Sequence, residues 1–231
     1  ALMTNMNLKQ PNATLAALCL TELLSWATLY YIFSIFVAPM QAELGWTQPE
    51  LMGALSFGLF CMGVSASETH SKANLRKTHA EVLEDVRRIV ELLRSLPADK
   101  RPGFEGNVST AFGCTLEGPV PESKVVELAV ALMEAGCDDI GLSDTTGYAN
   151  PAQVRRLIRL VRKEVGEDKL SSVHLHNTRG LGLANALAAL EEGITTLDSS
   201  LGGLGGCPYA PGASGNIVTE DLVFMLDAMG L

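Results

Sequence analysis

Residues 138–153 read DDIGLSDTTGYANPAQ, and this stretch holds the pattern that the larger part of the chain repeats. A short run, DDIGLSD, has the apolar character of a strand and is followed by a polar turn. Asn150-Pro151 then begins a helix, because asparagine caps a helix N-terminus and proline fits the first helical turn. A strand, a loop and a helix in this order predict one unit of an α/β protein.

The same unit recurs on both sides of this stretch. The predicted strands, after a strand end and loop at 64–75, are 106–112, 138–144, 171–176 and 195–200. The predicted helices are 78–96, 121–136, one from Asn150-Pro151, 181–192 before Gly193, and a last one capped by Thr219. Thr78 and Glu81 form a capping box, and Val82, Val86, Ile89 and Leu93 lie on one helix face. Strands alternating with helices predict a parallel sheet with right-handed crossovers.

Polar residues gather where the predicted strands end, as active-site residues do in α/β barrels. They are Asp144, His174, His176, Asp198, Cys207 and Asn216. Side chains at positions i and i+2 of a strand share one face, so VHLH presents two imidazoles together and predicts a metal site. The alternative to metal binding is that one of these histidines only forms a hydrogen bond and the other is exposed to solvent. His70 and His79, in or before a charged helix, are expected to be solvated.

A glycine-rich loop with a cysteine follows the last predicted strand. Residues 200–216 read SLGGLGGCPYAPGASGN, in which four glycines surround Cys207. Glycines permit sharp bends and close approach to a ligand, although a buried, inert thiol in a turn would have the same composition. This order of residues resembles the cysteine-loop signature of 3-hydroxy-3-methylglutaryl-CoA lyases, and the resemblance runs from about Val64 to Leu231.

The resemblance implies a fold and a site. The fold would be the C-terminal half, about strands 4–8, of a TIM-type (β/α) barrel. His174, His176 and Asn216 would bind one divalent metal, with Mg²⁺ or Mn²⁺ expected and Zn²⁺ or Co²⁺ as substitutes. Asp144 matches an active-site residue near the metal, although an Asp there also commonly orders a turn. Cys114 matches the family too, but we assign it no chemistry.

The resemblance also implies a reaction. The metal would hold the 3-hydroxyl and carboxylate of 3-hydroxy-3-methylglutaryl-CoA, and cleavage would give acetoacetate and the enolate of acetyl-CoA. Cys207 would protonate that enolate or assist in doing so. Two alternatives are kept: a related barrel with the same histidine pair, such as an isopropylmalate-synthase-like enzyme or a ketoacid aldolase, and a non-catalytic, membrane-tethered remnant. The cysteine loop favours the lyase.

One family motif does not occur in this sequence. In the lyases the first barrel strand carries Arg-Asp-Gly-Leu-Gln, which supplies a further metal ligand and the arginine that faces the developing enolate. An oxyanion partner commonly contributes orders of magnitude in rate. We therefore expect the chain by itself to have negligible lyase activity.

The first 63 residues differ from the rest. Residues 14–40 have Glu22 as their only charge and are long enough to cross a bilayer as a helix. With the following residues to 63 they resemble the first helices of major facilitator transporters. We therefore expect a transmembrane-like helical segment at 1–63 and the lyase half-barrel at 64–231. Two incomplete resemblances that meet without a linker suggest a chimera, by gene rearrangement or assembly error.

The composition of the chain limits the kinds of partner that it is expected to bind. The formal net charge is −9, which argues against nucleic acid as the main partner. The five cysteines form no CxxC pair, so neither a zinc ribbon nor a disulfide framework is indicated. Reduced thiols suit a cytoplasmic location for the lyase part, with membrane association if residues 14–63 form a span. The expected partner is an acyl-CoA substrate, and oligomerisation is left open.

Overall fold

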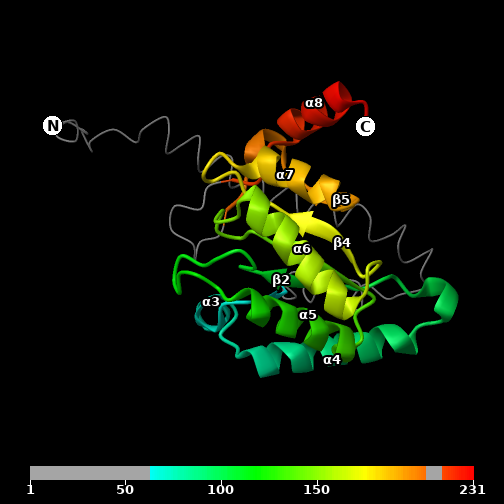
Figure 1. Ribbon diagram of the computed structural model, residues 1–231. Helices are drawn as coiled ribbons and strands as arrows, with labels where there is room; N and C mark the ends of the chain where they lie inside the picture. The colour runs from blue at the N-terminus through cyan, green and yellow to red at the C-terminus, as the bar shows by residue number, and fades with distance from the viewer. Residues whose placement is uncertain (1–62, 207–214) are drawn as a thin grey trace, which may run out of the picture. The chain divides into compact units, whose positions relative to one another are not determined.

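The computed structural model describes residues 63–206 and 215–231 (Figure 1). Its strands are β1 (Val64–Ser65), β2 (Glu105–Ser109), β3 (Asp139–Ser143), β4 (Leu170–His174) and β5 (Thr196–Asp198). Its α-helices are α3 (Glu68–Asn74), α4 (His79–Ser95), α5 (Glu122–Ala135), α6 (Pro151–Val165), α7 (Gly182–Glu191) and α8 (Thr219–Met229). Two short 3-10 helices, η1 (Ala98–Lys100) and η2 (Leu201–Gly203), complete the described part.

The described strands form one parallel sheet. The strand order is β1-β2-β3-β4-β5, so each strand pairs with its neighbours in the sequence. The predicted α/β fold with a parallel sheet is therefore confirmed. A bulge interrupts one pair: Ile140 pairs with Leu170, but Gly141 pairs with Ser172, so Ser171 is an extra residue in β4.

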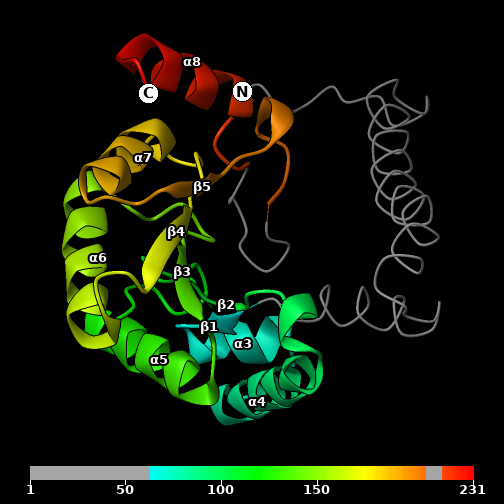
Figure 2. The same ribbon diagram turned by 90° about the vertical axis from the view of Figure 1, so that its right-hand side faces the viewer.

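The two faces of this sheet have opposite character. Figure 2 shows α4 to α7 along one side of the strands, and the strand residues that are buried in the core include Val64, Val108, Ile140, Leu142 and Val173. On the other face the strands carry polar side chains. Ser143 donates to Oδ1 of Asn107 at 2.7 Å, and Ser172 donates to Oε2 of Glu105 at 2.6 Å. The polar face is the one that can bind a ligand.

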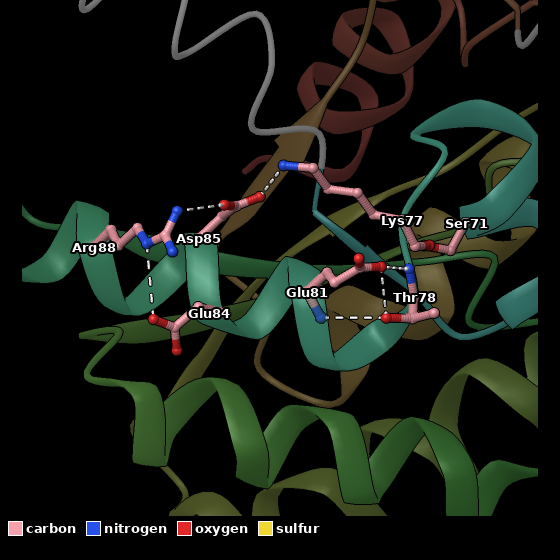
Figure 3. A network of polar contacts seen from close by, with 7 residues as sticks. All are labelled: Ser71, Lys77, Thr78, Glu81, Glu84, Asp85 and Arg88. Carbon is pink, nitrogen blue, oxygen red and sulfur yellow. Dashed lines mark hydrogen bonds and ion pairs between the residues drawn. The ribbon is translucent and has the colours of Figure 1, made fainter.

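Helix α4 begins as its sequence predicts. The Thr78 hydroxyl accepts from the Glu81 amide at 3.3 Å, and the Thr78 amide donates to the Glu81 carboxylate at 2.8 Å (Figure 3). Further along the same helix, Asp85 pairs with Lys77 and, at 3.8 Å, with Arg88. The apolar face buries Val82, Val86, Ile89 and Val90, whereas Leu93 is half-buried.

The other predicted helix boundaries largely hold. Pro121 precedes α5, and Gly136 ends it with φ of 105°. The Asn150 side chain caps α6 by accepting from the Gln153 amide at 3.0 Å. Exposed ion pairs then join α6 to its neighbours, Arg156 with Glu122 of α5 and Arg159 with Glu192 after α7. Capping residues and glycine stops are local signals, which explains why the sequence could place these ends.

Four local expectations are wrong. Residues after β1 form helix α3 instead of a loop, with Ser67 as its N-cap. His70 lies in that helix and is 1% exposed, so it is a core residue and not a solvated one. His79 is half-buried, with Nε2 2.7 Å from the Ser65 carbonyl oxygen. Thr219 is the first residue of α8 and not its cap, because its hydroxyl bonds to Ser199.

Several expectations fall on residues that the structure does not describe. These are the apolar segment at 14–40, its resemblance to a transporter and the boundary with residues 1–63. Within 63–206 and 215–231, no helix is both long enough and apolar enough to cross a membrane.

Candidate metal centre

Polar side chains meet at the carboxyl ends of three adjacent strands, β3, β4 and β5. His174 ends β4, Asp198 ends β5, and Asp144 follows β3. Parallel strands all end at the same edge of a sheet, so residues far apart in sequence come together there.

The two predicted histidines face one another. Nε2 of His174 lies 3.1 Å from Nε2 of His176, and the ring centroids are 5.1 Å apart at an interplanar angle of 68°. When two nitrogens each lie about 2.1 Å from one ion and the two metal–nitrogen bonds are at right angles, the nitrogens are about 3.0 Å apart. The spacing therefore fits two imidazoles on one metal ion.

Asn216 joins this pair through the backbone. It forms an antiparallel bridge with His176, and the flanking amides of Asn177 and Ile217 donate to Gly215 and Leu175 carbonyl oxygens at 3.1 Å each. The Asn216 amide nitrogen donates to the Leu204 carbonyl oxygen at 3.0 Å. The structure thus brings together the three residues that the sequence analysis predicted as ligands.

Burial keeps both imidazoles in the uncharged form that binds metals. Burial lowers the pKa of His174, against the opposing influence of Asp198. Burial, with a contribution from His174, lowers the pKa of His176 to about 4. Nδ1 of His176 is buried and has no hydrogen-bond partner among the described residues. A nitrogen set of this kind suits a divalent cation.

The described set is small for a complete metal site. In the described ranges, no group of three or more His, Cys, Asp or Glu side chains is arranged to hold a metal ion. The predicted set contains two such side chains, and its third member is the Asn216 amide. An octahedral ion such as Mg²⁺ would need ligands from elsewhere, including water or substrate.

Asp144 shapes the turn after β3. Its Oδ1 accepts from the backbone amides of Tyr148 at 2.8 Å and Ala149 at 3.1 Å. Its Oδ2 is buried without a hydrogen-bond partner in the described part of the chain. Burial raises the pKa of Asp144 to about 6, although those amides and Arg179 oppose the shift. Asp144 does order a turn, and its raised pKa brings its ionisation closer to neutral pH than that of an ordinary aspartate.

The cysteine loop is described only in part, and Cys207 lies outside the described residues. Before it, Gly202, Gly203 and Gly205 have positive φ values of 61°, 67° and 117°, as the predicted sharp bends require. A Cβ on Gly205 would lie 2.8 Å from Nδ2 of Asn216, so glycine permits this close approach. Cys114 is fully buried, and its sulfur accepts from the Leu116 amide at 3.4 Å.

Two further residues belong to this region, and the sequence assigned no role to either. Asp198 places Oδ2 3.4 Å from Nδ1 of His174. Arg179 lies over the ring of Tyr148, 3.9 Å from its centroid, and donates to the carbonyl oxygens of Thr146 and Gly147 at 3.0 Å and 2.8 Å. Position at a strand end was the only signal for Asp198, and no sequence signal pointed to Arg179.

The fold and the site define an α/β protein with its polar groups at the carboxyl edge of a parallel sheet, the class that contains many barrel enzymes. Residues 60–231 match the family described as HMGL-like, and the chain belongs to that family. The match begins close to the change in composition near Val64.

The relatives to which the chain is similar have names that fit this family. Hydroxymethylglutaryl-CoA lyase YngG of Bacillus subtilis is 41% identical over 186 residues, which are 80% of this chain and 60% of that protein. The human cytoplasmic 3-hydroxy-3-methylglutaryl-CoA lyase is 42% identical over 72% of this chain and 44% of its own length. An HMG-CoA lyase structure from Acinetobacter baumannii, in complex with coenzyme A and 3-methylmalate, superimposes with a TM-score of 0.66 at 48% identity. That match covers 72% of this chain and 53% of the other. The chain thus spans roughly half the length of these relatives.

Proposed function

We propose that residues 64–231 supply the C-terminal half of a metal-dependent hydroxymethylglutaryl-CoA lyase, with β1 to β5 as about strands 4–8 of its barrel. The reaction is cleavage of 3-hydroxy-3-methylglutaryl-CoA to acetyl-CoA and acetoacetate. The observation that carries this proposal is the facing pair of Nε2 atoms, 3.1 Å apart beside Asn216, in a chain that is 41% identical to a named lyase. The relatives' names favour the lyase over an isopropylmalate-synthase-like enzyme or an aldolase.

His174, His176 and the Asn216 carbonyl would hold a divalent ion, Mg²⁺ or Mn²⁺ by the family resemblance. A bound ion of this kind supplies a Lewis acid that holds and polarises a substrate hydroxyl and carboxylate. The two histidines contribute uncharged nitrogens, because burial disfavours their protonated forms. Their role is to bind and orient, and they need not move a proton themselves.

Proton movement is assigned to two other residues. Loss of the 3-hydroxyl proton, which the Asp144 carboxylate would accept, converts C3 to the ketone carbon of acetoacetate as the bond between C3 and C2 of the acyl-CoA breaks. C2 then takes up a proton, which Cys207 donates. Asp144 keeps its turn in place and can exchange a proton near neutral pH, because burial raises its pKa to about 6.

Turnover should also require the Arg-Asp-Gly-Leu-Gln motif that the relatives' first strand would supply. The Arg-Asp-Gly-Leu-Gln motif does not occur in the sequence, so an arginine for the enolate and a further metal ligand must come from outside residues 64–231. The proposal also includes a domain boundary near Val64. On the other side of it, residues 1–63 would form a transmembrane-like helical segment, and the chain as a whole would be a chimera.

A hybrid protein tests the function. Residues 1–63 are replaced by the corresponding first strands of a relative lyase, and acetoacetate release from 3-hydroxy-3-methylglutaryl-CoA is measured with Mn²⁺. The hybrid should turn over, and H174A and C207A should each reduce kcat at least about 100-fold. H79Q, which changes a histidine away from the site, should not. A folded hybrid that releases no acetoacetate contradicts the proposed reaction.

A further inference from the structure

The two facing histidines are held in different ways. His174 has both ring nitrogens engaged: Nε2 faces His176 at 3.1 Å, and Nδ1 lies 3.4 Å from Oδ2 of Asp198. His176 has only one, because its Nδ1 is buried without a hydrogen-bond partner among the described residues. The site therefore contains one histidine with a carboxylate behind it and one without.

Sheet register creates the contact with Asp198. His174 pairs directly with Asp198 across β4 and β5, so the two side chains lie on the same face of the sheet. The Asp198 side chain is 64% exposed, which leaves its carboxylate hydrated on the side away from the ring. A carboxylate accepts hydrogen bonds and donates none, so its place 3.4 Å from Nδ1 favours the tautomer of His174 with the hydrogen on Nδ1.

The position of this hydrogen determines which of the other ring nitrogens of His174 and His176 donate and which accept. A neutral imidazole has one N–H, so a hydrogen on Nδ1 leaves Nε2 of His174 as an acceptor. The facing Nε2 of His176 is then the donor in the 3.1 Å contact, and Nδ1 of His176 is left as an acceptor. Nδ1 of His176 has neither a donor nor an acceptor as a partner among the described residues. An unused acceptor costs less than an unused donor, so a bare nitrogen at this position agrees with the arrangement.

We propose that Asp198 is a positioning residue that holds His174 with its hydrogen on Nδ1 and its Nε2 lone pair directed into the site shared with His176. Carboxylates behind metal-binding histidines orient the ring and commonly change metal affinity by about 10–100-fold. The effect on affinity rests on the proposed function, because it requires that these histidines bind a metal. The tautomer itself does not depend on that function.

Nitrogen-15 NMR of the metal-free, 231-residue chain tests the tautomer. The chain has four histidines, so the imidazole signals can be resolved and assigned with H174Q and H176Q. We expect Nδ1–H for His174 and Nε2–H for His176. D198A should abolish the preference at His174, whereas D198N should preserve it, because the asparagine oxygen still accepts from Nδ1–H. D227N removes an exposed carboxylate on α8 and should change neither ring.

Mn²⁺ binding, measured on the same proteins by electron paramagnetic resonance, tests the consequence. D198A should raise Kd about 10–100-fold, D198N should raise it less, and D227N should leave it unchanged. Circular dichroism checks that each variant is folded.

The outcomes separate the two proposals. An Nε2–H tautomer for His174, or unchanged nitrogen shifts in D198A, overturns the role of Asp198 whatever the metal does. A tautomer change with equal Kd for D198A and the parent chain overturns its effect on affinity. A parent chain that binds no Mn²⁺ contradicts the proposed metal site, and with it the positioning role in metal binding, while the nitrogen shifts still decide the tautomer.

Discussion

At the scale of single residues, Asp144 shows how burial makes a carboxyl group sensitive to pH. Burial raises its pKa to about 6, above the ordinary aspartate value of 3.8. Because the folded-state pKa is the higher one, folding takes up a proton between about pH 4 and pH 6. The contribution of Asp144 to the free energy of unfolding therefore decreases as pH rises through this window and is constant above it.

D144N should remove this dependence, because an asparagine oxygen can still accept from the Tyr148 and Ala149 amides without ionising. The free energy of unfolding, measured by urea denaturation from pH 4 to pH 7, should fall by about 2–3 kcal/mol more in the parent chain than in D144N. His174 and His176 have lowered pKa values, so their contributions to the free energy of unfolding rise with pH. Both proteins contain these histidines, so the difference between the parent chain and D144N cancels their contributions. D227N serves as the control for a lost carboxylate. Parallel profiles for the parent chain and D144N would contradict the raised pKa.

At the scale of elements, the capping box of α4 stabilises one helix end with two reciprocal bonds. T78A removes the hydroxyl that accepts from the Glu81 amide and should lower the free energy of unfolding by about 1 kcal/mol. T78S keeps the hydroxyl and should recover most of that loss. S123A, at an exposed position in α5, is the control and should have little effect. If T78A were as stable as S123A, the box would contribute nothing measurable.

Close packing between α5 and β2 depends on Gly106. A Cβ at this position would lie 2.8 Å from Sγ of Cys137 and 3.1 Å from Cβ of Leu132. G106A should therefore lower the free energy of unfolding by about 1–3 kcal/mol, the usual cost of overpacking a core. Gly103 is a matched control, since a Cβ there meets no atom within 4 Å. Equal urea midpoints for G106A and G103A would show that the helix can move away at no cost.

At the scale of the whole molecule, the described five-stranded sheet has two edges, at β1 and β5. A complete barrel has no edges, and its interior excludes water from the reacting groups. The 231-residue chain should accordingly bind Mn²⁺ weakly and release acetoacetate at a negligible rate, even with Mg²⁺ or Mn²⁺ in excess. The measurement is a coupled assay on the purified chain, with the hybrid described above as the positive control. Robust turnover that H174A abolishes would show that the missing motif is dispensable.

Much of the fold could be predicted because its signals are local. Asn150, the Thr78–Glu81 pair and Gly136 act through atoms within one helical turn, so helix starts and stops follow from a few neighbouring residues. The alternation of strands and helices then leads to a parallel sheet. The facing histidines also needed only their i, i+2 spacing. Helix α3 was missed because its short, polar sequence owes its stability to burial of His70 and Ser71.

Residue types and their spacing thus determined, from the sequence by itself, the α/β pattern, the family resemblance and the candidate ligands. The tertiary structure decided which of them meet. The extra residue Ser171 puts Ser172 and His174 on the polar face, and the register of β4 with β5 sets Asp198 behind His174. Asn216 reaches His176 through a bridge between segments far apart in the chain. Strand register depends on packing over the whole sheet, and no local stretch of sequence contains that information.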